Sequence, residues 1–376
     1  MCDMKLKNPF VTTGYAGRKY FCDRVHETAE IVSRLDNGEN LTLLSPRRYG
    51  KTGLISRVLE AFRDRGDVAT VYVDVFSTRD LAEFTKVFSS AVFASVETSV
   101  EKAGASAAKF LRACRPTMTF DELTHLPKFS FEVSPTSAEA TLDSVFDYLK
   151  SKDRQIVIAI DEFQQIAEYP EKGIEALLRS RIQFLPNVRF IFSGSRLHMM
   201  AEMFHSPKRP FYQSTGNFNL GLIDRDKYYA FAAGFFRKAK RMLPRETFDG
   251  VYDRFDGITW YVQAVLKGLY AGPFPRPTTA SIDAVLLSLL AENADIFRYI
   301  LSKCTDGAAA LLKAIAAEGT VAEPTSGEFI RRNALPAPSS VSYALSKLTA
   351  DDLVYKTDAG YIVYDRLFAL WLRSNR

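Results

Sequence analysis

Apolar residues along this chain fall into short continuous runs, separated by longer stretches in which they recur every three or four positions. Continuous runs are typical of buried parallel strands, and the recurrent spacing is typical of helices. The predicted strands are 41–44, 69–76, 156–162 and 187–196. The predicted helices among them are 26–35, a helix from 54 on, 80–98, 137–150 and 172–185. This alternation indicates an α/β fold.

The second half of the chain is mostly helical. Helical spacing extends over 225–242, 247–255, 260–270 and 280–304, and a stiff Pro-rich linker covers 271–278. Three further helices, 308–318, 326–333 and 339–348, are followed by a two-stranded hairpin of 353–355 and 361–364. This order predicts a winged helix. Residues 104–135 fit neither pattern and predict an insertion or flap. We therefore expect an α/β domain at 1–215, a helical domain at 216–304 and a winged-helix domain at 305–376.

Composition narrows the class of protein but does not indicate its function. The chain has 376 residues, of which 47% are hydrophobic and 25% charged, and its net charge is +5. These values are ordinary for a soluble protein, and the small charge allows an acidic partner without requiring one. The four cysteines are too scattered for a zinc site or a disulfide framework. The N-terminus lacks the apolar core of a signal peptide, and no run approaches the length of about 18 apolar residues that a membrane helix needs. We expect a cytoplasmic protein without membrane contact.

The stretch after the first strand carries a recognisable chemistry. A basic loop closes with Gly50, Lys51 and Thr52 immediately before a helical pattern, and the N-terminus of a helix favours anions through its N–H groups and its dipole. In a Walker A loop the lysine reaches the β- and γ-phosphates and the Thr hydroxyl ligates Mg²⁺. The expected nucleotide-binding residues of the loop are Ser45, Pro46, Arg47, Arg48, Tyr49, Gly50, Lys51, Thr52 and Gly53.

The loop alone is moderately specific. Ser45 stands where the strict Walker A pattern has glycine. The Gly-Lys-Thr tripeptide is short, so an ordinary strand-to-helix turn with an exposed lysine is the alternative.

Two strands downstream end in polar residues. The strand 156–162 runs into two carboxylates, of which Asp161 is expected to hold the water shell of Mg²⁺ and Glu162 to orient or deprotonate the attacking water. The strand 187–196 ends at Ser195 and Arg196, the candidates for sensing the γ-phosphate; a serine that caps the following helix is the alternative. Together with the phosphate loop, these strand ends predict an ATP site with Mg²⁺.

Four segments together resemble a known family. The segments FCDRVHE, SPRRYGKTGL, IVIAIDEFQQI and FIFSGSRLHMM are similar to those of the bacterial and archaeal ATPase-domain family, which lies between the STAND and AAA+ groups of P-loop ATPases and is related to the Cdc6/Orc initiators. The similarity covers about 8–212. It implies a five-stranded parallel sheet with helices on both faces, ATP bound at the edge of the sheet, a helical lid and a C-terminal winged helix.

The resemblance also assigns roles outside the strands. It implies that the leading segment packs over the adenine, so Tyr20, Phe21 and Arg24 are candidate base contacts; a segment that only caps the sheet is the alternative. In the lid, Thr259 stands where the family usually has proline, so a direct contact of this helix with the nucleotide is not expected. The candidates for an arginine finger on a neighbouring subunit, or for plain surface arginines, are Arg179, Arg181 and Arg209.

Two functions follow from the sequence. The first is a Mg-dependent ATPase that acts as a conformational switch, with Gln164 or Ser195 sensing the product and with a nucleotide-dependent homo-oligomer as a possible form. The second is a DNA-binding regulator or mobile-element protein in which ATP sets the conformation. The third winged-helix segment offers only serines and Lys347 to base edges, so the winged helix has either DNA or a protein as its expected partner. Candidate phosphate contacts are Arg331, Arg332 and Lys356.

Overall fold

The computed structural model describes residues 6–96, 116–120 and 127–375. Its contacts divide the chain into two compact units. The first runs to Phe231 and includes Ile258–Trp260, and the second contains Ala232–Gly257 and the chain from Tyr261 on. Residues 97–115 and 121–126, which include the end of the predicted helix 80–98 and much of the predicted insertion 104–135, lie outside the described residues.

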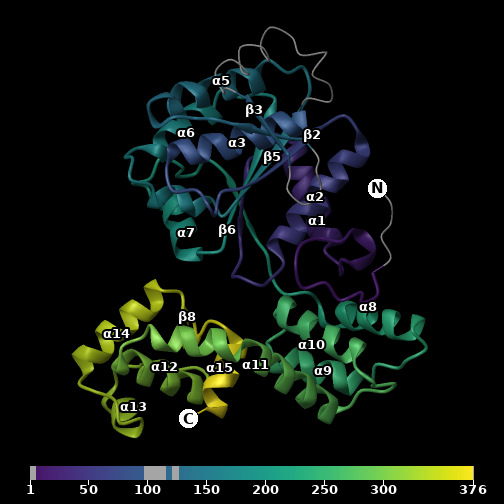
Figure 1. The fold of residues 1–376 in the computed structure, drawn as a ribbon, viewed down its shortest axis with the longest axis vertical. Helices are drawn as coiled ribbons and strands as arrows, with labels where there is room; N and C mark the ends of the chain where they lie inside the picture. Colours follow the sequence, from purple (N-terminus) through teal and green to yellow (C-terminus); the bar gives the residue numbers. More distant parts are fainter. Residues whose placement is uncertain (1–5, 97–115, 121–126, 376) are drawn as a thin grey trace. The chain divides into compact units, whose positions relative to one another are not determined.

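The first unit is built on a five-stranded sheet in which every pairing is parallel. The strands, in their order across the sheet, are β2 (Ala69–Asp74), β5 (Ile156–Asp161), β6 (Val188–Gly194), β1 (Leu41–Leu44) and β7 (Gly216–Asn219) (Figure 1). The parallel α/β fold expected from the sequence is therefore confirmed. In the register of β2 with β5, Asp74 pairs with Asp161, so two carboxylates reach the same edge of the sheet.

Helices bury both faces of this sheet. Because successive strand residues point to opposite sides, Ile158 and Ile160 enter one apolar cluster while Val157 and Ala159 enter another. The first cluster is closed by α3 (Leu81–Val96), α5 (Ala138–Lys150), α6 (Ile174–Ile182) and α7 (Leu197–His205). The second is closed by α1 (Val25–Asp36) and α2 (Lys51–Arg65). Burial on both sides explains why these strands lack the alternation of a half-exposed sheet.

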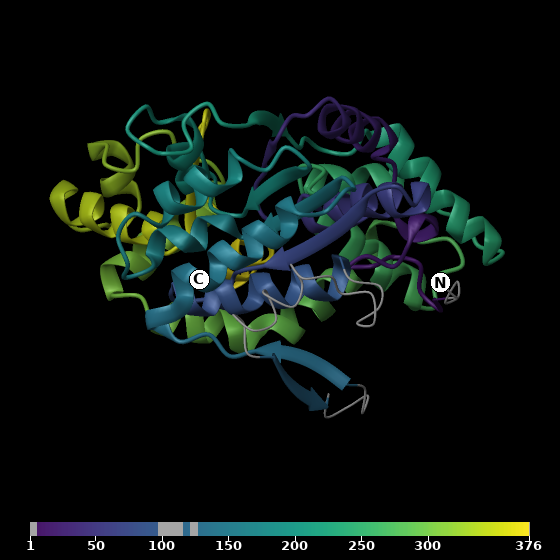
Figure 2. The same cartoon turned by 90° about the horizontal axis from the view of Figure 1, so that it is seen from above.

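Shorter elements complete the first unit. The 3₁₀ turns among the described residues are η1 (Arg18–Tyr20), η3 (Pro135–Ser137) and η4 (Phe163–Glu168). Where the sequence predicts an insertion, an antiparallel hairpin forms from β3 (Pro116–Phe120) and β4 (Pro127–Phe131). Figure 2 shows this hairpin standing out from the helices of the unit. The helix α8 (Arg225–Lys238) begins in the first unit and ends in the second.

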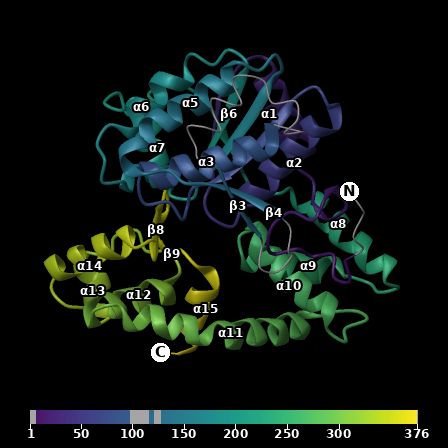
Figure 3. The same cartoon turned by 45° about the horizontal axis from the view of Figure 1, so that its top comes forward.

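The second unit is a helical segment followed by a winged helix. Its helical elements are α9 (Arg245–Arg254), most of α10 (Thr259–Ala271) and α11 (Thr279–Ser302). The elements α12 (Asp306–Glu318), α13 (Gly327–Arg332), α14 (Pro338–Ala350), β8 (Val354–Thr357), β9 (Gly360–Val363) and α15 (Arg366–Ser374) follow (Figure 3). The turn of the hairpin needs glycine at 360, where φ is +138° and a Cβ would lie 2.5 Å from the carbonyl oxygen of Val321.

The structure departs from the sequence prediction at three elements. The predicted boundary after residue 215 falls directly before β7, which pairs with β1, so the sheet extends past that boundary. The segment of β7 reads GNFN, and its single buried apolar side chain, that of Phe218, gives no strand pattern. The helix α15 was also not predicted, although it is strongly amphipathic, whereas α7 was expected only as a helix after the strand 187–196, without bounds.

Candidate functional site

The loop after β1 has the geometry of an anion-binding turn. Arg48 and Gly50 both have positive φ, at 73° and 94°, and α2 begins directly after them at Lys51. A left-handed backbone at Gly50 is accessible to glycine at little cost. The loop therefore turns its backbone into the start of a helix, where unpaired N–H groups and the helix dipole favour an anion.

Lys51 carries its charge inside this turn. The residue is only 7% exposed, and its Nζ donates a hydrogen bond to the Ser45 carbonyl oxygen at 3.1 Å. Burial lowers the pKa of Lys51, while the charges of Asp161 and Glu162 oppose that shift. The alternative of an ordinary turn with an exposed lysine does not fit this burial. A phosphate in the loop would supply the negative charge that favours the buried ammonium group.

Asp161 lies at the centre of the site and is 3% exposed. Its Oδ2 accepts hydrogen bonds from the hydroxyls of Thr52, at 2.9 Å, and Tyr72, at 3.0 Å. Its Oδ1 accepts from the Ser193 hydroxyl and from the Glu162 N–H, the latter at 3.1 Å. The structure thus brings together the two residues that the sequence assigns to Mg²⁺, Thr52 and Asp161.

The donor set at this edge fits a magnesium ion. Mg²⁺ prefers oxygen ligands, takes one or two from the protein and completes its shell with water and substrate phosphates. The Thr52 hydroxyl and the Asp161 carboxylate, side by side below the phosphate loop, provide such oxygens. Among the described residues, no group of three or more His, Cys, Asp or Glu side chains gathers into a separate metal-binding cluster.

Two residues of β2 join the site without having been predicted as site residues. Tyr72 donates to Asp161, and burial, followed by the Asp161 charge, raises the pKa of its phenol, so it stays a donor. Burial, and then the charges of Asp161 and Glu162, raise the pKa of Asp74. Their positions depend on the pairing of β2 with β5, which the sequence does not reveal. An aromatic residue and an acid at the end of this predicted strand are the sequence features that could have indicated that Tyr72 and Asp74 belong to the site.

Glu162 is held in place by two neighbours. Its Oε2 accepts from Gln164 Nε2 at 2.6 Å and from the Ser195 hydroxyl at 2.7 Å. Its backbone is left-handed, with φ of 56°, and the next residue, Phe163, is fully buried among Phe192, Phe204 and Phe211. Phe163 therefore anchors the turn that presents the carboxylate at the edge of the sheet.

Ser195 and Arg196 have partners within the protein. The Ser195 hydroxyl donates to Glu162, and Arg196 pairs with Glu168. Their role in sensing the γ-phosphate stays a prediction. For Ser195 the observed contact is with the residue expected to position water.

The leading segment packs against the start of α2. The Phe21 ring lies over Gly53, where an added Cβ would come within 2.9 Å of the ring, and Tyr15 packs edge-on against Phe21 at 5.4 Å. Tyr20 is buried, and its hydroxyl accepts from the Leu6 N–H. Phe21 thus lies next to the predicted nucleotide loop, which agrees with its predicted position; contact with a base stays a prediction.

Arg24 has a different environment from the one expected for a base contact. It is 3% exposed, its Nη2 donates to the Gly221 carbonyl oxygen at 2.7 Å, and its Nη1 pairs with Glu27 at 2.6 Å. These bonds tie α1 to the chain after β7. The geometry favours a structural role, because reaching a base would require these buried bonds to break.

The start of α10 contacts the phosphate loop directly. The Trp260 N–H donates to the Arg48 carbonyl oxygen at 3.0 Å. The Thr259 hydroxyl donates to the backbone carbonyl oxygen of Tyr49 at 3.2 Å. The Arg48 guanidinium lies 4.4 Å from the centre of the Trp260 ring, within the range of a cation–π contact. Thr259, which replaces the family's usual proline, therefore binds the loop backbone.

Several arginines considered from the sequence are bound within the chain. Arg181 pairs with Asp143, and Arg209 pairs with Glu175 and Glu202. In the winged helix, Arg332 forms a two-pronged contact with Glu318. The role of Arg181 or Arg209 as an arginine finger stays a prediction.

The fold and the site define the class of this protein. A parallel sheet with the order β2-β5-β6-β1-β7, a phosphate loop after β1 and two carboxylates at the end of β5 are the features of a P-loop ATPase. The family model described as an ATPase domain predominantly from Archaea matches residues 21–265. This match covers more than half of the chain, so the protein belongs to that ATPase-domain family. A second family model, for a winged helix domain, matches residues 295–374.

Solved structures agree with this assignment at the level of the fold. The chain is similar to a Walker-type ATPase of Pyrococcus abyssi, with a TM-score of 0.65 and 19% identity over 97% of this chain and 99% of that one. It is also similar to the Orc1 protein of Aeropyrum pernix in complex with DNA, with a TM-score of 0.54 and 14% identity over 98% and 96% of the two chains. The comparison with curated proteins found no significant match.

Among the helices of the described residues, none is both long enough and apolar enough to span a membrane.

The contact of Tyr72 with Asp161 leads to a first prediction. In Tyr72→Phe, Oδ2 of Asp161 loses one of its two hydroxyl donors. Because removing a partner of a metal-binding carboxylate typically weakens metal affinity, we expect the Mg²⁺ concentration for half-maximal ATP binding to rise about 10-fold. Titration with labelled ATP at several Mg²⁺ concentrations measures this. Tyr212→Phe, at an exposed position of the same unit, is the control and should behave as wild type. Equal Mg²⁺ dependence in both variants would refute the assignment.

Proposed function

We propose that this protein binds ATP with Mg²⁺, hydrolyses it slowly by in-line attack of water on the γ-phosphate, and acts as a conformational switch. The observation that carries this proposal is the arrangement around Asp161. Its carboxylate accepts a hydrogen bond from the Thr52 hydroxyl, and the next residue, Glu162, directly after β5, is a second carboxylate held by two donors. The ATPase-domain family match supports the reaction.

Each residue of the loop and the strand ends has a role in this proposal. Lys51 and the N–H groups at the start of α2 bind the β- and γ-phosphates and stabilise the charge that develops on them. Thr52 and Asp161 hold the Mg²⁺, which neutralises phosphate charge when bound. Glu162 orients the attacking water. Gln164 and Ser195 both donate hydrogen bonds to Oε2 of Glu162, so they hold this carboxylate in position at the site.

Substituting the two charged residues separates binding from hydrolysis. Lys51→Ala should weaken ATP binding strongly, because the loop loses its buried cation. Glu162→Gln should keep ATP binding but lower the hydrolysis rate by about 10²- to 10⁴-fold, since the amide cannot accept the proton of the water. Phosphate release and labelled-ATP binding measure the two effects.

Surface variants of the same kind provide the controls. Lys208→Ala and Glu132→Gln change exposed residues and should leave both quantities unchanged. Full hydrolysis in both Lys51→Ala and Glu162→Gln would overturn the proposed ATPase mechanism.

The switch is supported by the way α10 begins. Its first residues, Thr259 and Trp260, bind the carbonyl oxygens of Tyr49 and Arg48, while most of the helix belongs to the second unit. A change in the loop backbone on ATP binding must therefore either move the start of α10 or break these bonds. In both cases the contacts or the position of α10, which continues into the second unit, would change on ATP binding.

Tryptophan fluorescence reports on this contact. The chain has two tryptophans, and Trp371→Phe leaves only Trp260, whose ring lies against Arg48. We expect ATP to change the emission of this variant with the same midpoint as labelled-ATP binding. The reverse variant, Trp260→Phe, keeps only Trp371 as its emitter and serves to show that the signal comes from the loop contact. An emission that stays constant while ATP saturates the site would argue against coupling through α10.

DNA binding through the winged helix is the second candidate. It is favoured by the winged-helix match and by the exposed positions Ser339, Ser340 and Tyr343 on α14. The similar Orc1 protein was solved in complex with DNA. Arg332 is already bound by Glu318, so Arg331 and Lys347 are better candidates for phosphate contacts.

The salt dependence of binding tests this candidate. Arg331→Ala and Lys347→Ala should each lower the slope of log affinity against log salt by about one, because each removes one neutralised phosphate. Duplex binding followed by fluorescence anisotropy at several salt concentrations measures the slope. Arg298→Ala, on α11, is the control. Absence of duplex binding at low salt would exclude this function for the isolated protein.

A further inference from the structure

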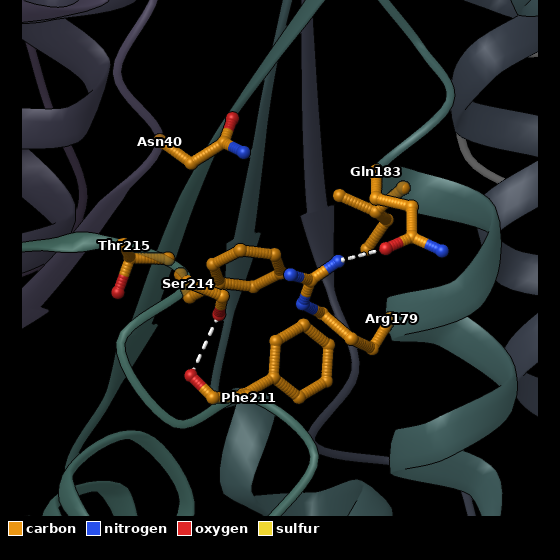
Figure 4. Close-up of a pocket in the computed structure, with 8 residues that line it drawn as sticks. Asn40, Arg179, Gln183, Phe211, Ser214 and Thr215 are labelled. Carbon is orange, nitrogen blue, oxygen red and sulfur yellow. Dashed lines mark hydrogen bonds between the residues drawn. The ribbon is translucent and has the colours of Figure 1, made fainter.

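A cavity of about 110 Å³ lies in the first unit, away from the phosphate loop (Figure 4). Its wall includes Asn40, Arg179, Gln183, Phe192, Phe211 and Thr215. Asn40 and Thr215 directly precede β1 and β7, so the cavity lies at the amino-terminal ends of these strands. The phosphate loop follows the carboxyl end of β1, about 13 Å further along a strand of this length. The cavity is therefore separate from the ATP site.

Arg179 brings an uncompensated positive charge to this cavity. Its Nη1 donates to the Gln183 side-chain oxygen at 2.8 Å, and within the described part of the chain it forms no ion pair. Its Nε is buried and donates to no described residue. Glu175, the acidic residue of α6, is instead paired with Arg209 at 3.0 Å. A buried guanidinium N–H without an acceptor is costly, and an anion in the cavity would supply that acceptor.

A second donor faces the same space. The Asn40 side-chain oxygen accepts the Phe190 N–H at 2.8 Å, which fixes the orientation of the amide. Figure 4 shows the Asn40 amide nitrogen turned toward the side of the cavity where Arg179 lies. The amide and the guanidinium together offer N–H groups, which match the oxygens of an anion.

The rest of the wall is apolar and limits the ligand. Ile182, Phe192 and Phe211 are buried side chains on this wall. The Ser214 hydroxyl donates to the Phe211 carbonyl oxygen at 2.7 Å, so its proton is already used. The volume has room for roughly eight water-sized groups. A planar guanidinium beside an apolar wall in such a volume suits a carboxylate carried on a few carbon atoms.

We propose that this cavity is a binding site for a small carboxylate with a short apolar body, in which Arg179 binds the carboxylate and Asn40 donates to it. The apolar part of the ligand lies against Phe192 and Phe211. This proposal does not rest on the ATPase mechanism, because neither Arg179 nor Asn40 belongs to the phosphate loop or to the ends of β5 and β6.

Calorimetric titration of the full chain with sodium butyrate tests the proposal. At constant ionic strength, butyrate should bind, and its neutral counterpart butyramide should not, because only the anion pairs with Arg179. Arg179→Gln should weaken butyrate binding at least about 10-fold. The matched control is Arg181→Gln, on the same helix, whose side chain pairs with Asp143 outside the cavity. It should bind butyrate as wild type does.

A second variant keeps the test decisive if Arg179→Gln fails to fold. Asn40→Asp retains an acceptor for the Phe190 N–H and places a carboxylate on the wall of the cavity that Arg179 also lines, so the protein itself supplies the anion. We expect this variant to keep the fold and to lose butyrate binding. The proposal is overturned if wild type does not bind butyrate or if Asn40→Asp binds it unchanged. The first result would mean that water alone fills the cavity.

Discussion

The buried carboxylate of Asp161 is the constraint on which the active edge of this protein depends. An ionised carboxylate is stable inside a protein only when hydrogen-bond donors replace water. Here the donors come from four different elements: Thr52 at the start of α2, Tyr72 on β2, Ser193 on β6, and the backbone of Glu162 after β5. The strand order that places β5 between β2 and β6 is thus the order that satisfies this charge.

This constraint also determines how the phosphate loop is held. Thr52 follows Lys51 directly, so its bond to Asp161 fixes the first turn of α2 below the loop. On the other side, Thr259 and Trp260 bind the carbonyl oxygens of Tyr49 and Arg48. The loop is therefore held in its middle and at its carboxyl end by different parts of the chain. A loop held in this way is preorganised for phosphate, because less backbone order remains to be gained on binding.

Four strands of the sheet and the charged residues of the candidate site could be predicted from the sequence, because the pattern that indicates them lies in neighbouring residues. Each strand that leads to the candidate site is an apolar run with polar residues at its end, so Lys51, Thr52, Asp161 and Glu162 could be predicted as site residues without a structure. Tyr72 and Trp260 could not, because the first depends on the register of two strands and the second on a contact across more than two hundred residues. The strand β7 was missed because GNFN has no repeating pattern.

The aromatic residues behind β6 connect the turn after β5 with the cavity near Arg179. Phe163, which follows Glu162, lies 4.6 Å from Phe192 and 5.4 Å from Phe211, measured between ring centres, and the latter two rings line the cavity near Arg179. These rings are almost completely buried, and densely packed interiors transmit displacements because they have little free volume. A shift of Phe211 at the cavity therefore has to be accommodated by Phe163, and through it by the left-handed turn at Glu162. The turn that carries Glu162 thus depends on packing that reaches the cavity near Arg179.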